Sequence, residues 1–157
     1  MKETHEPLLV VAVAAVVFRG KRLLCMRRSA CRDAGPGLWE TLSGRVRPGE
    51  DPLAAVAREI SEECGLEVEL DPRPITTYPA KRIDEPMVVI VYRAQAISGE
   101  VVMSDEHDAF EWLTPDELAE RSPLAPLVNA ARLALDLSWV ARDSGAPGNL
   151  AGSKGNK

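Results

Sequence analysis

The run of apolar residues from Pro7 to Phe18 constrains the fold of this chain more than any other segment. It reads PLLVVAVAAVVF and stops abruptly at Arg19-Gly20. A helix that spans a bilayer needs about 20 apolar residues, so this run is too short to cross a membrane. A signal peptide would carry a basic segment before its apolar core, whereas here two glutamates offset the single lysine. The many valines and the sharp end favour a buried β-strand.

The rest of the chain alternates between strand and helix patterns within a length that suits one domain. We expect strands over 8–18 and 21–28 with a turn at Gly20, a strand over 39–47, a helix over 52–64, an extended segment over 66–78, a strand over 86–97, short strands over 99–103 and 109–113, and helices over 114–121 and 123–141. Strands before and after a central helix, with helices at the end, predict an α/β fold: a mixed sheet with helices on both faces.

This domain is expected over residues 7–141. Residues 1–6 form an N-terminal extension, and 142–157 are rich in Gly, Ser, Asn and Pro, which predicts a disordered tail.

Charge and cysteine usage exclude several functions. The net charge of −5 argues against binding of extended nucleic acid or of an anionic membrane, although a local basic site can still bind a small phosphorylated ligand. Cys25, Cys31 and Cys64 show no C-x-x-C spacing, and the chain has only two histidines. A structural zinc site is therefore not expected. We expect the three cysteines to be reduced thiols in a cytoplasmic protein.

The predicted helix over 52–64 carries an unusual cluster of carboxylates. Asp51 and Pro52 suit its start, and Gly65 suits its end. Glu59, Glu62 and Glu63 lie about 130° around the helix from the apolar stripe that should face the sheet. That stripe consists of Leu53, Val56, Ala57, Ile60 and Cys64. The acids form either a solvated face, with Arg58 paired to Glu62 at i,i+4, or a site for a hard divalent cation.

The stretch GRVRPGEDPLAAVAREISEECGL, residues 44–66, resembles the Nudix box, the signature of the Nudix hydrolase superfamily. All nine positions that the box specifies are filled. They are Gly44, Glu50, Arg58, Glu59, Ile60, Glu62, Glu63, Gly65 and Leu66. With ordinary residue usage the chance of this match at a given start is below about one in 10⁸. The order of strands around the box is similar to the family's domain over about residues 7–141.

This resemblance implies an α/β/α sandwich around a mixed sheet. It implies hydrolysis of a pyrophosphate bond in a nucleotide or nucleoside diphosphate derivative, with Mg²⁺ or Mn²⁺ as cofactor. The metal ligands it implies are Glu59, Glu62, Glu63 and the backbone carbonyl of Ser43. Arg58 and Glu50 match the residues that pair to orient the loop and helix, and Gly44 and Gly65 match positions where backbone geometry matters.

The general base is less defined by the box, because some members use a box glutamate and others a glutamate from a later loop. In SDEHDAFEWL, Glu106 is the candidate for a further metal ligand or base, and a solvated loop acid is the alternative. We expect the adjacent His107 to be a surface histidine. One departure from many members is Leu42-Ser43-Gly44, where they carry Pro-Gly-Gly.

Residues outside the box are candidates for substrate binding. Arg27, Arg28, Lys81 and Arg82 are candidate phosphate contacts, with solvent exposure as the alternative. Trp39 is a candidate for stacking on a base, and core packing is equally compatible with its position.

Two other functions are compatible with the same scaffold. Chemistry similar to isopentenyl-diphosphate isomerase would need a catalytic cysteine beside an acid, and Cys31 is the only loop cysteine near the box. Non-catalytic nucleotide-sensing modules often lose box acids, and none is lost here. The expected partner is a small nucleotide-type substrate, and homodimers are common in the family.

Overall fold

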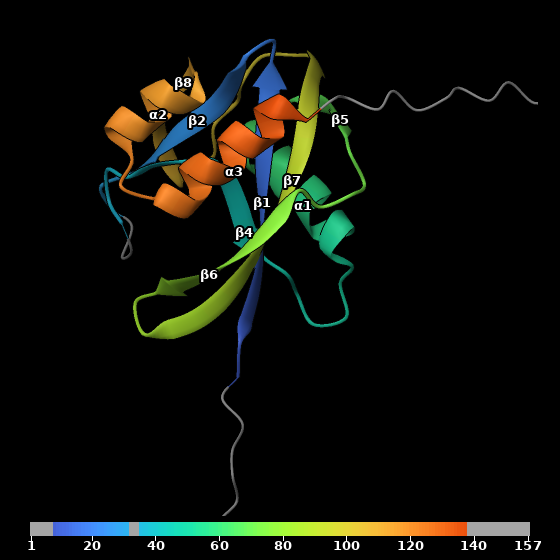
Figure 1. Cartoon of the computed structure of the whole chain (residues 1–157), viewed down its shortest axis with the longest axis vertical. Helices are drawn as coiled ribbons and strands as arrows, with labels where there is room; N and C mark the ends of the chain where they lie inside the picture. Colours follow the sequence, from blue (N-terminus) through green and yellow to red (C-terminus); the bar gives the residue numbers. More distant parts are fainter. Residues whose placement is uncertain (1–7, 32–34, 138–157) are drawn as a thin grey trace, which may run out of the picture.

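The computed structural model describes residues 8–31 and 35–137. Within these ranges the chain forms an eight-stranded sheet and three helices (Figure 1). The elements are β1 (Val10–Arg19), β2 (Arg22–Arg28), β3 (Trp39–Glu40), β4 (Leu42–Arg45), α1 (Pro52–Cys64), β5 (Glu67–Leu70), β6 (Thr76–Arg82), β7 (Glu85–Ser98), β8 (His107–Leu113), α2 (Pro115–Arg121) and α3 (Ala125–Asp136). None of these helices has the length and apolar character that a membrane crossing requires.

Most of the elements predicted from the sequence are confirmed. The helix over 52–64 is α1, and Gly20 with φ 62° turns the chain between β1 and β2. The strand expected over 39–47 is divided into β3 and β4, and the extended segment over 66–78 becomes β5 and the start of β6.

The strand predicted over 99–103 is wrong. Gly99 adopts φ +93° and turns the chain away from the sheet. The N–H of Val102 then donates to the carbonyl of Cys64 at 2.9 Å, so the segment packs beside the end of α1. The last helix begins at Ala125 rather than at 123, and the segments expected over 1–6 and 142–157 lie outside the described residues.

Strand β1 lies at the centre of the sheet, as the apolar run predicts. It pairs in parallel with β7, from Val10↔Met87 to Phe18↔Gln95, and antiparallel with β2 and β4. Its side chains alternate between two cores: Val13 and Val17 pack on the side of α1, and Val16 and Phe18 on the side of α2 and α3. Figure 1 shows α3 on one face of the sheet and α1 on the other. The predicted α/β/α arrangement is therefore confirmed.

Helix α1 has the caps that its sequence predicts and buries most of the predicted stripe, but its buried side is shifted around the helix axis. The carboxylate of Asp51 accepts the N–H of Leu53 at 2.8 Å, and Gly65 ends the helix with φ 65°. The inclusion of Ala57 in the buried stripe is wrong, because Ala57 is exposed. Ala55 and Glu63 are buried instead, since β4 packs along that side of the helix. The acid face and the buried face therefore overlap at Glu63.

The three cysteines are free thiols, with Cys25 and Cys64 buried and Cys31 exposed. Burial raises the pKa of the Cys25 thiol to about 12, which keeps it protonated and unreactive.

Replacing Asp51 by alanine tests the cap of α1. We expect Asp51→Ala to lower the free energy of unfolding by about 1 kcal/mol, because the N–H of Leu53 loses its acceptor. Urea denaturation followed by circular dichroism measures the change. Asp51→Asn keeps an acceptor oxygen and should lose much less, so an equal loss in both variants would contradict the assignment.

Candidate active site

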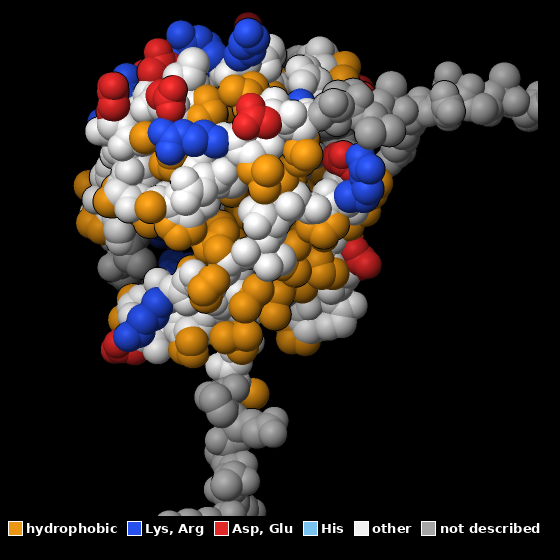
Figure 2. Space-filling model, viewed as in Figure 1, with side chains coloured by type: hydrophobic (Ala, Val, Ile, Leu, Met, Phe, Trp, Pro, Cys, Tyr) orange, Lys and Arg blue, Asp and Glu red, His pale blue; other side chains and the backbone are white. Residues whose placement is uncertain are grey.

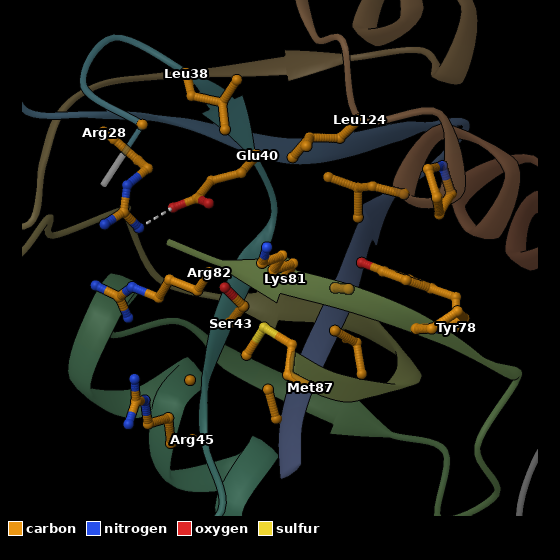
Figure 3. A pocket seen from close by; sticks show the side chains of 18 of the residues that line it. Arg28, Leu38, Glu40, Ser43, Arg45, Tyr78, Lys81, Arg82, Met87 and Leu124 are labelled. Carbon is orange, nitrogen blue, oxygen red and sulfur yellow. Dashed lines mark hydrogen bonds and ion pairs between the residues drawn. The ribbon is translucent and has the colours of Figure 1, made fainter. Parts of the chain in front are cut away.

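A cavity of about 790 Å³ opens between the β6–β7 hairpin, strands β3 and β4, and the segment that leads into α3. Figure 2 shows a hollow at the left of this face, above the hairpin. Acidic, basic and apolar side chains line different parts of its wall (Figure 3). They include Glu40, Glu59 and Glu106; Arg28, Lys81 and Arg82; and Leu38, Tyr78, Met87 and Leu124. The cavity thus combines acids of the box region with cations on the facing hairpin.

Arg58 ties the loop before α1 to the helix. Its Nε and Nη2 donate to the two oxygens of Glu50 at 2.8 and 3.0 Å, and Nη2 also donates to the carbonyl of Arg45 at 3.1 Å. These hydrogen bonds, together with one from the backbone N–H of Arg47, lower the pKa of Glu50 to about 2. The bracing role that the resemblance implies for Arg58 and Glu50 agrees with these contacts.

Arg58 also holds one of the box acids. Its Nη1 donates to Oε1 of Glu59 at 2.7 Å, whereas the i,i+4 contact to Glu62 is longer, at 3.4 Å. The Glu59 carboxylate lies directly against β4, where a Cβ on Gly44 would come within 1.9 Å of Oε1. Only glycine at position 44 allows this approach of strand and carboxylate.

Glu63 is the most strongly perturbed acid of the site. The residue is 4% exposed, and its Oε2 has no hydrogen-bond partner among the described residues. Burial, followed by the nearby carboxylates of Glu59, Glu106 and Glu40, raises its pKa to about 9, against the effect of a backbone hydrogen bond from Ser43. A buried carboxylate with an unpartnered oxygen needs either a proton or a cation. The chemistry of Glu63 and its neighbouring carboxylates therefore fits the binding of a divalent cation.

The acids are not arranged as a closed metal site. In residues 8–31 and 35–137, no three His, Cys, Asp or Glu side chains meet in a group that could hold a metal ion. Glu59 is engaged by Arg58, and the side chain of Glu62 is 53% exposed. Binding of a cation by these acids therefore requires some of their side chains to reorient.

Glu106 lines the cavity and contributes to the raised pKa of Glu63, which brings the two acids into one electrostatic environment. The expectation that His107 lies at the surface is wrong. Its side chain is 1% exposed, because His107 begins β8 opposite Arg28 of β2 and its Nε2 donates to Oε1 of Glu40 at 3.1 Å.

Glu40 is a cavity residue that the motif does not specify. Arg28 Nη1 donates to the same oxygen, Oε1, at 3.0 Å. The sequence signal that could have found Glu40 is an acid on a short strand just before the box, where its neighbour Trp39 packs into the core.

The structure brings three of the five predicted substrate contacts to the cavity: Arg28, Lys81 and Arg82. Arg27 points to the other side of β2 and pairs with Asp108 at 2.6 Å. Trp39 packs against the core, and the Arg121 guanidinium lies 5.3 Å from its ring centroid. Trp39 therefore contacts the core and is not among the described residues that line the cavity.

Known proteins share this fold and are similar in sequence. The model of the NUDIX domain family matches residues 8–135. A MutT-like protein of Streptomyces ambofaciens is 40% identical over 119 residues, which are 75% of this chain and 72% of that protein. The CTP pyrophosphohydrolase of Escherichia coli (strain K12) is 32% identical over 122 residues, 75% of this chain and 84% of that protein. The crystal structure of a MutT NUDIX hydrolase from Burkholderia pseudomallei is 33% identical, covers 82% of this chain and 96% of that one, and superposes with a TM-score of 0.61.

Fold, box and relatives agree on one class of protein, a hydrolase that acts on phosphorus-containing anhydrides. The chain belongs to the Nudix family.

Replacing Gly44 by alanine tests the contact between β4 and Glu59. The added Cβ displaces the Glu59 carboxylate, so we expect Gly44→Ala to weaken Mg²⁺ binding and lower turnover at least about 10-fold, with the fold retained. Isothermal titration measures Mg²⁺ binding, a hydrolysis assay measures turnover, and a thermal melt checks that the fold is retained. Ala57→Ser, an equally small change on the exposed side of α1, is the control, and equal Mg²⁺ affinity in both variants would contradict the role of Gly44.

Glu63 makes the stability of the metal-free protein depend on pH. Its pKa is raised from 4.5 to about 9, so between these values the folded state binds more protons than the unfolded state. Stability therefore falls as pH rises through this window. In EDTA we expect Glu63→Gln to be more stable than the natural protein by about 1 kcal/mol or more near pH 8, and the gain to vanish near pH 5. Urea denaturation across this pH range measures the free energy of unfolding of both proteins, with Glu100→Gln as the exposed control. A gain in stability that does not vary with pH would refute the raised pKa of Glu63.

Proposed function

We propose that this chain is an Mg²⁺- or Mn²⁺-dependent pyrophosphohydrolase that cleaves a pyrophosphate bond in a nucleoside triphosphate or nucleoside diphosphate derivative. The observation that carries the proposal is the unpartnered, buried oxygen of Glu63 beside Glu59, next to a cavity whose facing wall carries Lys81 and Arg82. This pairs an acidic cation site with a basic phosphate site. The relative named CTP pyrophosphohydrolase supports the same substrate class.

Glu59, Glu62 and Glu63 would hold the cation, with the backbone carbonyl of Ser43 as a further ligand. When bound, a divalent cation neutralises adjacent phosphates and lowers the pKa of bound water. The hydrogen bonds of Arg58 to Glu50 hold the loop before α1 against the helix that carries these acids. Gly44 leaves room for the Glu59 carboxylate against β4.

Glu106 is the proposed proton acceptor or additional metal ligand. It lines the cavity close enough to Glu63 to raise the pKa of that group. A carboxylate at this position would take a proton from the attacking water, while Lys81 and Arg82 orient the phosphates for in-line attack. Lys81 also pairs with Asp84 at 3.6 Å, in the turn of the same hairpin.

The two alternative functions receive less support. Cys31, the cysteine that isomerase-like chemistry would need, is exposed, lies 3.3 Å from the Ser29 hydroxyl and does not line the cavity. A non-catalytic nucleotide sensor would not need all the box acids, and this chain retains them. A cytoplasmic location and a homodimer belong to the proposal on the strength of the free thiols and of the family resemblance.

A hydrolysis screen tests the proposal. The purified protein is assayed with Mg²⁺ or Mn²⁺ on NTPs, dNTPs, NDP-sugars, ADP-ribose and dinucleoside polyphosphates. We expect metal-dependent turnover, and Glu62→Gln should lower kcat/KM at least about 100-fold because a metal ligand is lost. Glu106→Gln should lower kcat about 10²–10⁴-fold and remove one limb of the pH profile.

Glu120→Gln, which neutralises an exposed acid of α2, is the control and should keep the full rate. Folded protein with no turnover on any of these substrates would refute the proposed pyrophosphohydrolase activity. Full activity in Glu62→Gln would refute the metal site.

A further inference from the structure

The carboxylate of Glu40 is held by hydrogen bonds to one of its two oxygens. Arg28 and His107 both donate to Oε1, at 3.0 and 3.1 Å. Oε2 accepts no hydrogen bond from any residue of the described ranges. It is also not one of the fully buried polar atoms of these ranges that lack a hydrogen-bond partner, so it is accessible. Since Glu40 lines the cavity, this oxygen is open to a ligand (Figure 3). Two donors on one oxygen leave the side chain little freedom to turn, so the acceptor has a defined direction.

The wall around this oxygen suits a flat, largely apolar ring. Leu38 and Leu124 lie near Glu40 in Figure 3, and Met87 lies on the hairpin side of the same cavity. Tyr78 contributes its ring to the wall, and burial, followed by the charge of Glu40, raises the pKa of its hydroxyl to about 12. The hydroxyl therefore stays neutral.

An ionised carboxylate accepts hydrogen bonds and donates none. It therefore matches a ring that presents an amino group, as cytosine and adenine do. Uracil and hypoxanthine carry a carbonyl oxygen at the corresponding position, which would face Oε2 as a second acceptor. A site built around a polar partner rejects the analogue that lacks it more strongly than an apolar pocket does.

We infer that Glu40 determines base specificity and selects nucleotides whose base carries the exocyclic amino group of cytosine or adenine. Arg28 and His107 act as positioning residues that fix the direction of its free oxygen. The inference rests on the proposed function, because it concerns the substrate of the same cavity.

Two matched substrate pairs test the selection. CTP and UTP differ by amino against carbonyl at one ring position, and ATP and ITP differ in the same way. We expect kcat/KM to favour the amino-bearing member of at least one pair by on the order of 10–100-fold, the range for a hydrogen bond to a charged group. Ratios near one in both pairs, in an enzyme that hydrolyses these nucleotides, would overturn the inference and leave the proposed function standing.

Substitution of Glu40 assigns the preference to this residue. Glu40→Gln replaces the acceptor pair by an amide that can also donate, so we expect the CTP/UTP or ATP/ITP ratio to fall to about one or to invert. Glu69→Gln, the same change on β5 away from the cavity, should keep the natural ratio. An unchanged ratio in Glu40→Gln would overturn the assignment.

Two further measurements separate this role from a structural one. The first is calorimetric binding of CMP and UMP to the natural protein in EDTA, which depends neither on turnover nor on a variant. CMP should bind more tightly than UMP if the enzyme selects cytosine over uracil. AMP and IMP are compared in the same way. His107→Phe should reduce the base ratio, and His107→Gln, which keeps a donor for Oε1, should restore much of it. Equal binding within both monophosphate pairs would refute the inference.

Discussion

The burial of β1 on both faces is the constraint on which the rest of the molecule depends. A strand with apolar side chains on each side needs two covering layers, and α1 supplies one while α2 and α3 supply the other. Pairing of β4 with β1, from Ala12↔Arg45 to Ala15↔Leu42, carries this order to the box, because β4 is the strand against which α1 packs. The acids of α1 are thus placed by the core of the sheet rather than by a loop.

The electrostatics of the site follow from that packing. Helix α1 presents its acids toward β4, so Glu63 is drawn into the buried layer and Glu59 comes against Gly44. Arg58 compensates Glu59 and Glu50 with a planar fork that a lysine could not reproduce. Glu63 has no such cation among the described residues, and an unneutralised buried carboxylate is the feature that a divalent metal would relieve.

Much of this architecture could be predicted from the sequence. The apolar run identified the central strand, the caps at Asp51 and Gly65 fixed both ends of α1, and the spacing of the box identified the acids. The burial of Ala55 and Glu63 could not be assigned from helical periodicity, since a pattern of apolar residues does not reveal that β4 packs along that side of the helix.

His107 and Glu40 were missed for a related reason. Their contact joins residues 67 positions apart, and the register of β2 with β8 and β3, which creates it, is a property of the folded sheet.

The β6–β7 hairpin has a second consequence beyond the cavity. Strand β6 pairs only with β7 in the described sheet, so its other side is an edge with main-chain groups available for another strand. Pro79 offers no N–H along that edge, and Lys81 and Arg82 put positive charge at its end. The residues on the cavity side of this hairpin therefore also discourage self-association of the sheet, so removing this charge would alter solubility as well as the proposed phosphate contacts.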